Sequence, residues 1–160
     1  MGAMGAMGAM GAMGAMGAMG AMGAMGAMGA MGAMGAMGAM GAVALGGAIG
    51  SLARHGVNAA FAQMFARPVP YATAAVNVTG SIVIGVLAGL LASGRVTMSP
   101  NMRAFVFVGL LGGFTTFSSF MLDTLTLTHG ADHALAMSNI IAQVGLGLLA
   151  VYAGYYFVTS

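Results

Sequence analysis

Residues 109–120 bring together side chains that could do chemistry: three glycines, four hydroxyl residues and three phenylalanines in an otherwise apolar stretch. Adjacent glycines weaken a helix by roughly 1 kcal/mol each relative to alanine. Hydroxyl side chains offer the backbone local hydrogen bonds in place of helical ones. Non-helical backbone at bilayer depth is tolerated only inside protein or beside a polar cavity. The run therefore predicts a helix that is interrupted at its paired glycines, and a site at that interruption.

The chemistry that these residues suit best is the binding of a small anion. Hydroxyls, backbone N–H groups released by a helix break and the edges of phenyl rings are weak donors that can replace water around such an ion. A fixed cationic side chain would hold the ion too tightly for conduction. Phe117 and Phe120 are spaced to project from one helical face. Without the flanking residues, this pair would be interpreted as ordinary core phenylalanines.

Enzymatic interpretations find little support. His129, Asp132 and His133 have a spacing that could hold a metal ion, but the same residues also suit a polar turn in which Asp132 caps the next helix. His55 has no carboxylate or serine partner at the spacing of a catalytic triad. A phosphate-binding loop needs a lysine, and the sequence has none. We expect no enzyme activity.

The composition indicates that the bilayer is the solvent. The sequence is 60% hydrophobic and 4% charged, whereas soluble domains have about 25% charged residues. The net charge of +2 is too small and scattered for binding nucleic acid. There is no cysteine, so no disulfide framework is expected. No signal peptide with a basic start is visible, and insertion is expected to rely on the first membrane segment.

Residues 1–42 are a perfect Met-Gly-Ala repeat. A three-residue period distributes glycine around every helical face and leaves no packing stripe, and the absence of proline argues against a collagen-like helix. The open alternatives are a tract expansion, a gene-model artefact or a disordered tail, with a membrane-associated segment as a further alternative. A start at Met40 would give an ordinary opening to the segment that follows, which favours the artefact. We expect 43–160 to form the folded domain.

That domain contains apolar stretches of about the 20 residues needed to span a bilayer. Ser99 and Pro100 are typical of a helix start, whereas the prolines of 67–70 predict an extended turn. The sequence thus predicts an all-α membrane protein with four transmembrane helices, the third of which is broken near its middle. The four expected segments are 43–65, 71–91, 99–127 and 132–158.

Small and polar residues recur at four-residue spacing, which keeps them on one helical face. Such stripes let membrane helices approach closely and form hydrogen bonds with one another. Asn77, Asn139 and Gln143 are too polar to face lipid, so they must point at one another, at the broken segment or at a wet pathway. The stripes comprise Gly46, Gly50, Arg54 and Asn58; Thr73, Asn77, Ser81, Gly85 and Gly89; and Asn139, Gln143 and Gly147.

Three motifs, at 112–120, 46–54 and 76–81, resemble those of the CrcB/Fluc family of fluoride channels, in the same order and at similar spacing. The resemblance covers essentially all of residues 43–160. It implies a fluoride-specific channel that exports cytoplasmic fluoride passively from a prokaryotic inner membrane. It also implies an antiparallel, dual-topology homodimer, or a heterodimer with a second chain, surrounded by lipid. The weak arginine bias between the predicted loops suits insertion in both orientations.

The resemblance further assigns roles to individual residues. The side chain of Asn77 projects into the pore, a ring pair contacts fluoride, and backbone carbonyls hold a structural Na⁺ at the dimer interface, as suits a hard cation. The residues concerned are Phe117, Phe120, Asn77, Ser118 and Thr116 in the fluoride pathway, Arg54 at a vestibule, and Gly112 and Thr115 around Na⁺.

Several positions depart from the common family pattern. Ile82 stands where phenylalanine is common, Ala72 where glycine is common, and Asp123 where glutamate is commoner. Asn139 and Gln143 replace tyrosine and serine, and the sequence leaves the roles of these two residues and of Asp123 open. The sequence leaves two other classes of protein open. A small dual-topology, proton-coupled exporter of organic cations would need Asp123 as its membrane carboxylate. A non-transporting assembly subunit would use the polar stripes for packing alone.

Overall fold

The computed structural model describes residues 3–65 and 70–160, and residue contacts divide the chain into two units, Met1–Gly38 and Ala39–Ser160. The described residues contain helices and no strand. The expected turn at 67–70 lies outside the described residues except for its last proline, Pro70. The elements in chain order are α1 (Ala3–Met64), α2 (Tyr71–Ala92), α3 (Pro100–Arg103), the π-helix η1 (Ala104–Leu111), α4 (Gly112–Phe114), α5 (Phe117–His129) and α6 (His133–Thr159).

Among the described residues, four stretches of helix are long and apolar enough to cross a membrane: Met34–Met64, Tyr71–Ala92, Pro100–His129 and His133–Thr159. The expected all-α class with four spans is therefore confirmed. The first span belongs to a helix, α1, which also includes the repeat from Ala3 onward. Whether the repeat belongs to the native protein, and whether 43–160 forms the domain, stay predictions.

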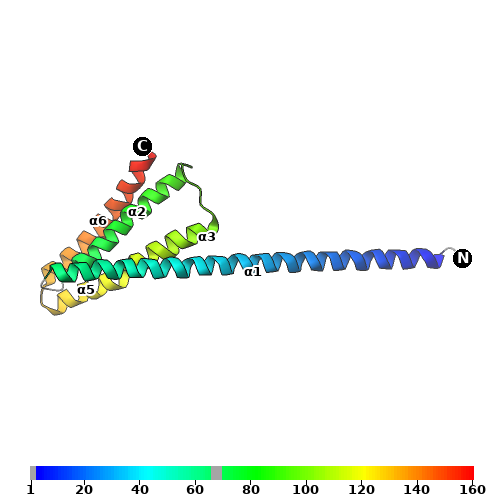
Figure 1. The fold of residues 1–160 in the computed structure, drawn as a ribbon, viewed down its shortest axis with the longest axis horizontal. Helices are drawn as coiled ribbons and strands as arrows, with labels where there is room; N and C mark the ends of the chain where they lie inside the picture. The colour runs from blue at the N-terminus through cyan, green and yellow to red at the C-terminus, as the bar shows by residue number, and fades with distance from the viewer. Residues whose placement is uncertain (1–2, 66–69) are drawn as a thin grey trace. The chain divides into compact units, whose positions relative to one another are not determined.

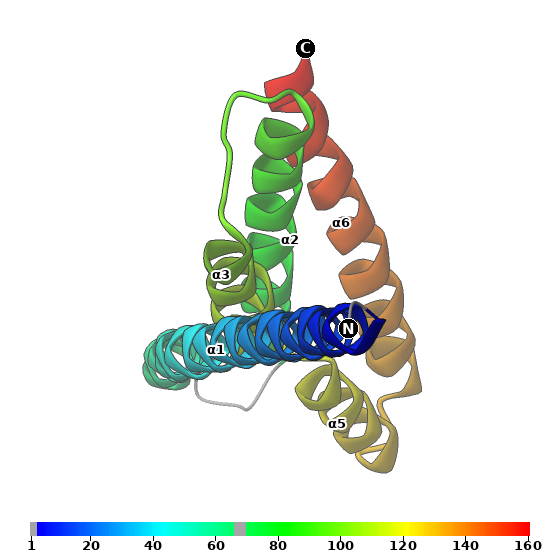
Figure 2. The same ribbon diagram turned by 90° about the vertical axis from the view of Figure 1, so that its right-hand side faces the viewer.

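The helices α2 and α6 lie side by side along most of their length (Figure 1, Figure 2). Glycines make this approach possible. A methyl group at Gly154 would lie 2.6 Å from the Ile82 carbonyl oxygen, and one at Gly89 would lie 2.7 Å from the Tyr155 carbonyl oxygen. Close backbone approach through small residues is how membrane helices gain packing energy when lipid competes for apolar surface. The part of the predicted α2 stripe that contains Gly85 and Gly89 therefore packs against α6.

A second glycine contact joins the end of α1 to the third span. Gly46 and Gly50 are buried against the backbone of η1, and a methyl group at Gly113 would lie 2.6 Å from the Gly47 carbonyl oxygen. Gly46 lies against the Phe105 carbonyl oxygen, and Gly50, one turn later in α1, lies against the Phe114 backbone nitrogen. The contact therefore follows the third span toward its interruption.

The third span is interrupted, but the expected position of the interruption was wrong. Gly112 and Gly113 are helical, in α4, and the break falls at Thr115 and Thr116, where the backbone is extended. Gly113 serves the contact with α1 instead of unwinding the helix, whereas Gly112 is exposed. The threonines can leave the helix because side chains replace their helical hydrogen bonds, as described below. The π-helix η1 before the break was not predicted.

The predicted helix ends agree with the structure to within two residues, except the start of the first segment, which was expected at 43 and which α1 extends back to Ala3. Ser99 is the N-cap of α3, where its hydroxyl accepts a hydrogen bond from the Met102 N–H at 3.3 Å. Gly94 follows α2 with a φ of +69°, a left-handed conformation that glycine adopts without strain. Asp132 precedes α6 as expected, but its side chain makes no capping hydrogen bond.

Candidate functional site

The site is built around the two extended residues between α4 and α5. Thr115 has a ψ of 161° and Thr116 a φ of −155°, so the chain direction changes before α5 begins at Phe117. The Thr116 hydroxyl accepts a hydrogen bond from the Ser119 N–H at 3.2 Å and so caps α5. Threonine is a favoured N-cap residue because its oxygen satisfies an N–H group that the first helical turn leaves unpaired. The break is thus a capped helix start in the middle of a span.

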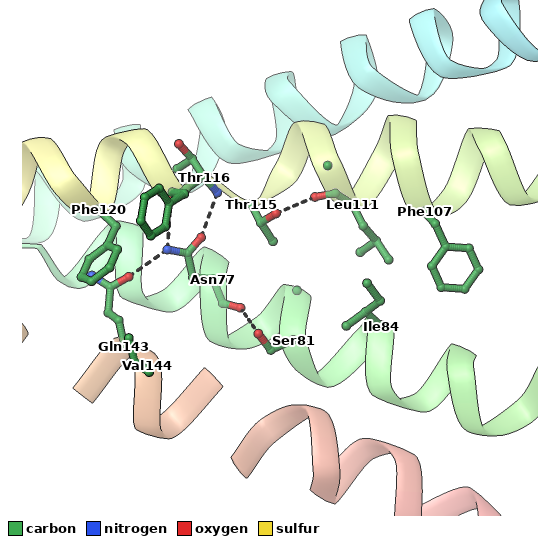
Figure 3. Close-up of a pocket in the computed structure, with 13 residues that line it drawn as sticks. Asn77, Ser81, Ile84, Phe107, Leu111, Thr115, Thr116, Phe120, Gln143 and Val144 are labelled. Atoms are coloured by element: carbon green, nitrogen blue, oxygen red, sulfur yellow. Dashed lines mark hydrogen bonds between the residues drawn. The ribbon is translucent and has the colours of Figure 1, made fainter. Parts of the chain in front are cut away.

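Asn77 of α2 forms hydrogen bonds with the backbone at this break. Its Oδ1 accepts a hydrogen bond from the Thr116 N–H at 2.9 Å, and its Nδ2 donates to the Thr116 carbonyl oxygen at 3.2 Å (Figure 3). One side-chain amide therefore pairs with both backbone groups of a residue that has left the helix. This pairing matters in a membrane, where no bulk water is present to satisfy exposed backbone groups.

Two backbone carbonyls are released as a consequence. In a continuous α-helix the Gly112 carbonyl would accept from the Thr116 N–H, and the Thr115 carbonyl from the Ser119 N–H. Here those N–H groups donate to Asn77 Oδ1 and to Thr116 Oγ1 instead. Gly112 and Thr115 are the two residues that the resemblance assigned to a cation, and their carbonyls lack these helical partners.

Of the alternatives left open for the three amides, the structure shows two: the amides contact one another, and Asn77 also contacts the break. Asn77 Nδ2 donates to Gln143 Oε1 at 2.8 Å, and Gln143 Nε2 donates to Asn139 Oδ1 at 2.8 Å. Asn139 Nδ2 in turn donates to Thr124 Oγ1 at 2.9 Å, on α5. Asn139 and Gln143 are both buried. These hydrogen bonds join α2, α6 and α5 into one polar network.

A cavity of about 390 Å³ lies against the break. No charged side chain is among its lining residues. All the predicted site residues except Ser118 and Arg54 line this cavity (Figure 3). Its other lining residues include apolar side chains and the amide of Gln143. The lining residues used below are Asn77, Gly112, Thr115, Thr116, Phe117, Phe120 and Gln143.

The predicted ring pair lines this cavity. The ring centroids of Phe117 and Phe120 are 5.7 Å apart with an interplanar angle of 71°, an edge-to-face arrangement. Phe120 is 4% exposed, whereas Phe117 is 73% exposed on the isolated chain. An edge-to-face pair keeps the positive rim of one ring directed at the negative face of the other. Both rings border the cavity, but the Phe120 ring is buried within the chain and the Phe117 ring lies at its surface.

Ser118 and Arg54 lie outside the cavity lining. The Ser118 hydroxyl is 3.3 Å from Thr116 Oγ1 and so touches the hydroxyl cluster of the break. Arg54 is half-buried on α1, four residues beyond Gly50, which packs against the backbone near Phe114. It therefore extends the helical face that approaches the break, and its vestibule role stays a prediction.

Sequence reasoning flagged Gln143 without giving it a role, and it missed Leu111, Gly80 and Ile84 as cavity residues. The signal for Gln143 was its polarity within a membrane span, and that for Gly80 was the neighbouring Asn77 motif. Apolar residues such as Leu111 and Ile84 gave no signal, because nothing in their type distinguishes a cavity wall from a lipid-facing surface.

No group of three His, Asp or Glu side chains suited to a metal occurs within residues 32–65 and 70–160, so the alternative of a metal at His129, Asp132 and His133 has no support there. Asp123 of α5 has one buried carboxylate oxygen, Oδ2, which has no hydrogen-bond partner among the described residues.

Comparison with known proteins supports the resemblance. The profile of the CrcB-like protein family, described as Camphor Resistance (CrcB), matches residues 41–155. A protein from Opitutus terrae is 44% identical over 114 residues, which cover 71% of this chain and 86% of that protein. One from Paramagnetospirillum magneticum is 44% identical over 118 residues, covering 73% and 92%. One from Methylobacterium radiotolerans is 46% identical over 114 residues, covering 71% and 79%.

All three relatives are named Fluoride-specific ion channel FluC. The matched region contains all four stretches of the site: the end of α1, Asn77, the break and the amides of α6. With four apolar helices and this match, the chain is a multi-pass membrane protein. The chain belongs to the CrcB family.

Proposed function

We propose that this protein is a fluoride-specific ion channel that lets cytoplasmic fluoride leave passively and so lowers its concentration in the cell. The observation that supports this most directly is the capped break, with Asn77 and the ring pair around one uncharged cavity inside apolar helices. The relatives carry the name of an ion channel and not of an enzyme. The inner membrane of a prokaryote is the matching location.

The cavity suits an anion that must enter and leave quickly. Burying an unpaired charge costs tens of kcal/mol in a low-dielectric medium, so donors must replace the water that the ion sheds. A lysine or arginine would supply one strong site, but conduction needs binding that is weak and repeated. Ring edges and the Thr116 hydroxyl supply weak donors in the cavity lining. The hydroxyls of Ser118 and Ser119 lie outside the lining and contact the Thr116 hydroxyl at 3.3 and 3.1 Å.

The functional unit in this proposal is a dimer. Phe117 lines the cavity and is nevertheless 73% exposed, so one wall of the cavity lies at the surface of the single chain. Val108, Leu122 and Leu125 are also exposed on the third span. A second copy in antiparallel orientation is the proposed cover, and a related second chain is the alternative. Membrane lipid would surround the remaining apolar surface.

The released carbonyls of Gly112 and Thr115 fit the expected structural Na⁺. Sodium is a hard cation, and it is well suited to uncharged oxygen ligands. Both carbonyls lack the N–H partner that a continuous helix would give them. We propose that these two oxygens, together with their equivalents in the second copy, hold one Na⁺ at the dimer interface and neutralise the facing carbonyl dipoles.

The transport proposal predicts fluoride efflux from liposomes that contain the purified full chain. A fluoride electrode should record efflux well above that of empty liposomes, while a chloride electrode records almost none. Efflux at the level of empty liposomes, or equal rates for chloride, would contradict the proposal. Asp123→Asn tests the exporter alternative, since a proton-coupled exporter would lose all transport without its only membrane carboxylate, whereas the channel should keep most of its efflux.

The assembly proposal predicts that the protein in detergent has twice the mass of one chain, and that this mass depends on Na⁺. Replacing Na⁺ by a large organic cation should shift the protein toward single chains, because an ion that binds only the assembled form stabilises it by mass action. Light scattering with size-exclusion chromatography measures this. A single-chain mass in the presence of Na⁺ would contradict the dimer, and a dimer indifferent to Na⁺ would contradict the ion site.

A further inference from the structure

We propose that Gln143 and Asn139 are positioning residues, which fix the Asn77 amide and the start of α5 through a one-directional row of hydrogen bonds. We call this row the amide relay; it consists of Asn77, Gln143, Asn139 and Thr124. Its transport consequences depend on the proposed function, whereas its structural consequences do not.

The direction of the hydrogen bonds is the same at every step of the amide relay. Asn77 donates to Gln143, Gln143 donates to Asn139, and Asn139 donates to Thr124. Thr124 Oγ1 then donates to the Phe120 carbonyl oxygen at 2.8 Å. Aligned hydrogen bonds polarise one another in a low-dielectric interior and are strengthened by it. The relay therefore behaves as a unit, and loss of one member weakens the next.

The relay determines which way the Asn77 amide faces. Gln143 Oε1 is an acceptor, so the Asn77 group that faces it must be the amide nitrogen, Nδ2. The Asn77 oxygen is thereby left to accept from the Thr116 N–H. If the amide turned over, Asn77 Oδ1 would face Gln143 Oε1, two acceptors would meet, and the Thr116 N–H would lose its partner. Gln143 thus selects the amide orientation that maintains the break.

The relay also reaches α5 at two points. Asn77 binds the backbone at Thr116, the cap of α5, and Asn139 binds Thr124, eight residues further along. Between these two points lie Phe117 and Phe120. The polar contacts from α2 and α6 therefore hold both ends of the segment that presents the ring pair to the cavity. Gln143 itself also lines this cavity.

Hydrogen–deuterium exchange of the full chain in lipid nanodiscs tests the relay without any transport measurement. Gln143→Met keeps the side-chain length but removes the acceptor for Asn77, so backbone exchange in segment 115–119 should rise about tenfold. Asn139→Leu leaves the contact between Asn77 and Gln143 in place, so exchange should rise mainly in 120–126. Gln63→Met is the matched control, the same change at an exposed position of α1, and should alter neither segment.

Gln143→Glu keeps the inference testable if Gln143→Met does not fold. The carboxylate still accepts from Asn77 but cannot donate to Asn139, so 115–119 should stay protected while 120–126 loses protection. Unchanged exchange in Gln143→Met, or an equal rise in every span for both the Gln143 and Asn139 variants, would overturn the relay. In liposomes Gln143→Met should lower fluoride efflux about threefold. If the wild type moves no fluoride while the exchange pattern holds, the proposed function fails and the relay stands.

Discussion

Phe117→Ile is expected to reduce fluoride efflux by at least about tenfold while the protein remains folded. Isoleucine keeps an apolar side chain but removes the positive ring edge, which is the feature that an anion can contact. A contact worth about 1.4 kcal/mol at the barrier corresponds to tenfold in rate, and aromatic contacts reach this size where water is excluded. Phe117 is 73% exposed on the isolated chain, so its packing within that chain changes little.

The control is Phe157→Ile on α6, the same substitution at a ring that is 84% exposed and far from the break in sequence. It should leave efflux unchanged. Both variants should elute from a size-exclusion column as the wild type does, which separates a loss of transport from a loss of assembly. An assembly subunit would tolerate isoleucine at both positions, since apolar replacements of similar volume cost little in packing. Equal efflux from the Phe117 variant and the wild type would therefore contradict the role of the rings.

The polar residues of α2 and α6 differ in how much of their arrangement follows from the sequence. The sequence predicted that Asn77, Asn139 and Gln143 avoid lipid, because an amide in a membrane span needs a polar partner. It did not decide between contact with one another, with the broken segment or with water. Nor did it predict their order in the relay. Four-residue spacing identifies the face of a helix, but it does not say how far one helix is shifted along its neighbour. Thr124, which ends the relay, gave no signal because a threonine in a membrane helix can satisfy itself by bonding the backbone.

The break illustrates the limit of local reasoning. Gly112 and Gly113 have the lowest helix propensity in the span, and they were expected to be its interruption. Both remain helical, and Gly113 has to be small because it packs against Gly47 of the neighbouring helix. The interruption occurs at Thr115 and Thr116, where a partner 39 residues away takes the N–H. Helix propensity contains no information about such a distant partner.

Asn77→Leu is expected to have the largest effect, a fall in fluoride efflux of about a hundredfold. Leucine has nearly the same shape but removes hydrogen bonds to Thr116 N, Thr116 O and Gln143 Oε1, of 2.9, 3.2 and 2.8 Å. Each such bond contributes about 0.5–1.5 kcal/mol, and a buried group left unpaired costs about 1–3 kcal/mol. The Thr116 N–H can then donate to the Gly112 carbonyl, its partner in a continuous α-helix. We expect the α-helix to re-form across the break.

Re-formation of the helix across the break differs from a general loss of stability. Two further variants distinguish these two effects of Asn77→Leu. Asn77→Asp keeps an oxygen for the Thr116 N–H, so the break should persist while the added negative charge repels fluoride. Asn58→Leu, the same change as the first variant at an exposed position of α1, should leave efflux intact. If helix re-forms in Asn77→Leu, exchange of the Thr116 amide stays slow while Na⁺ no longer affects assembly, because the Gly112 carbonyl is occupied. Wild-type efflux or an unchanged response to Na⁺ in Asn77→Leu would show that Asn77 does not maintain the break.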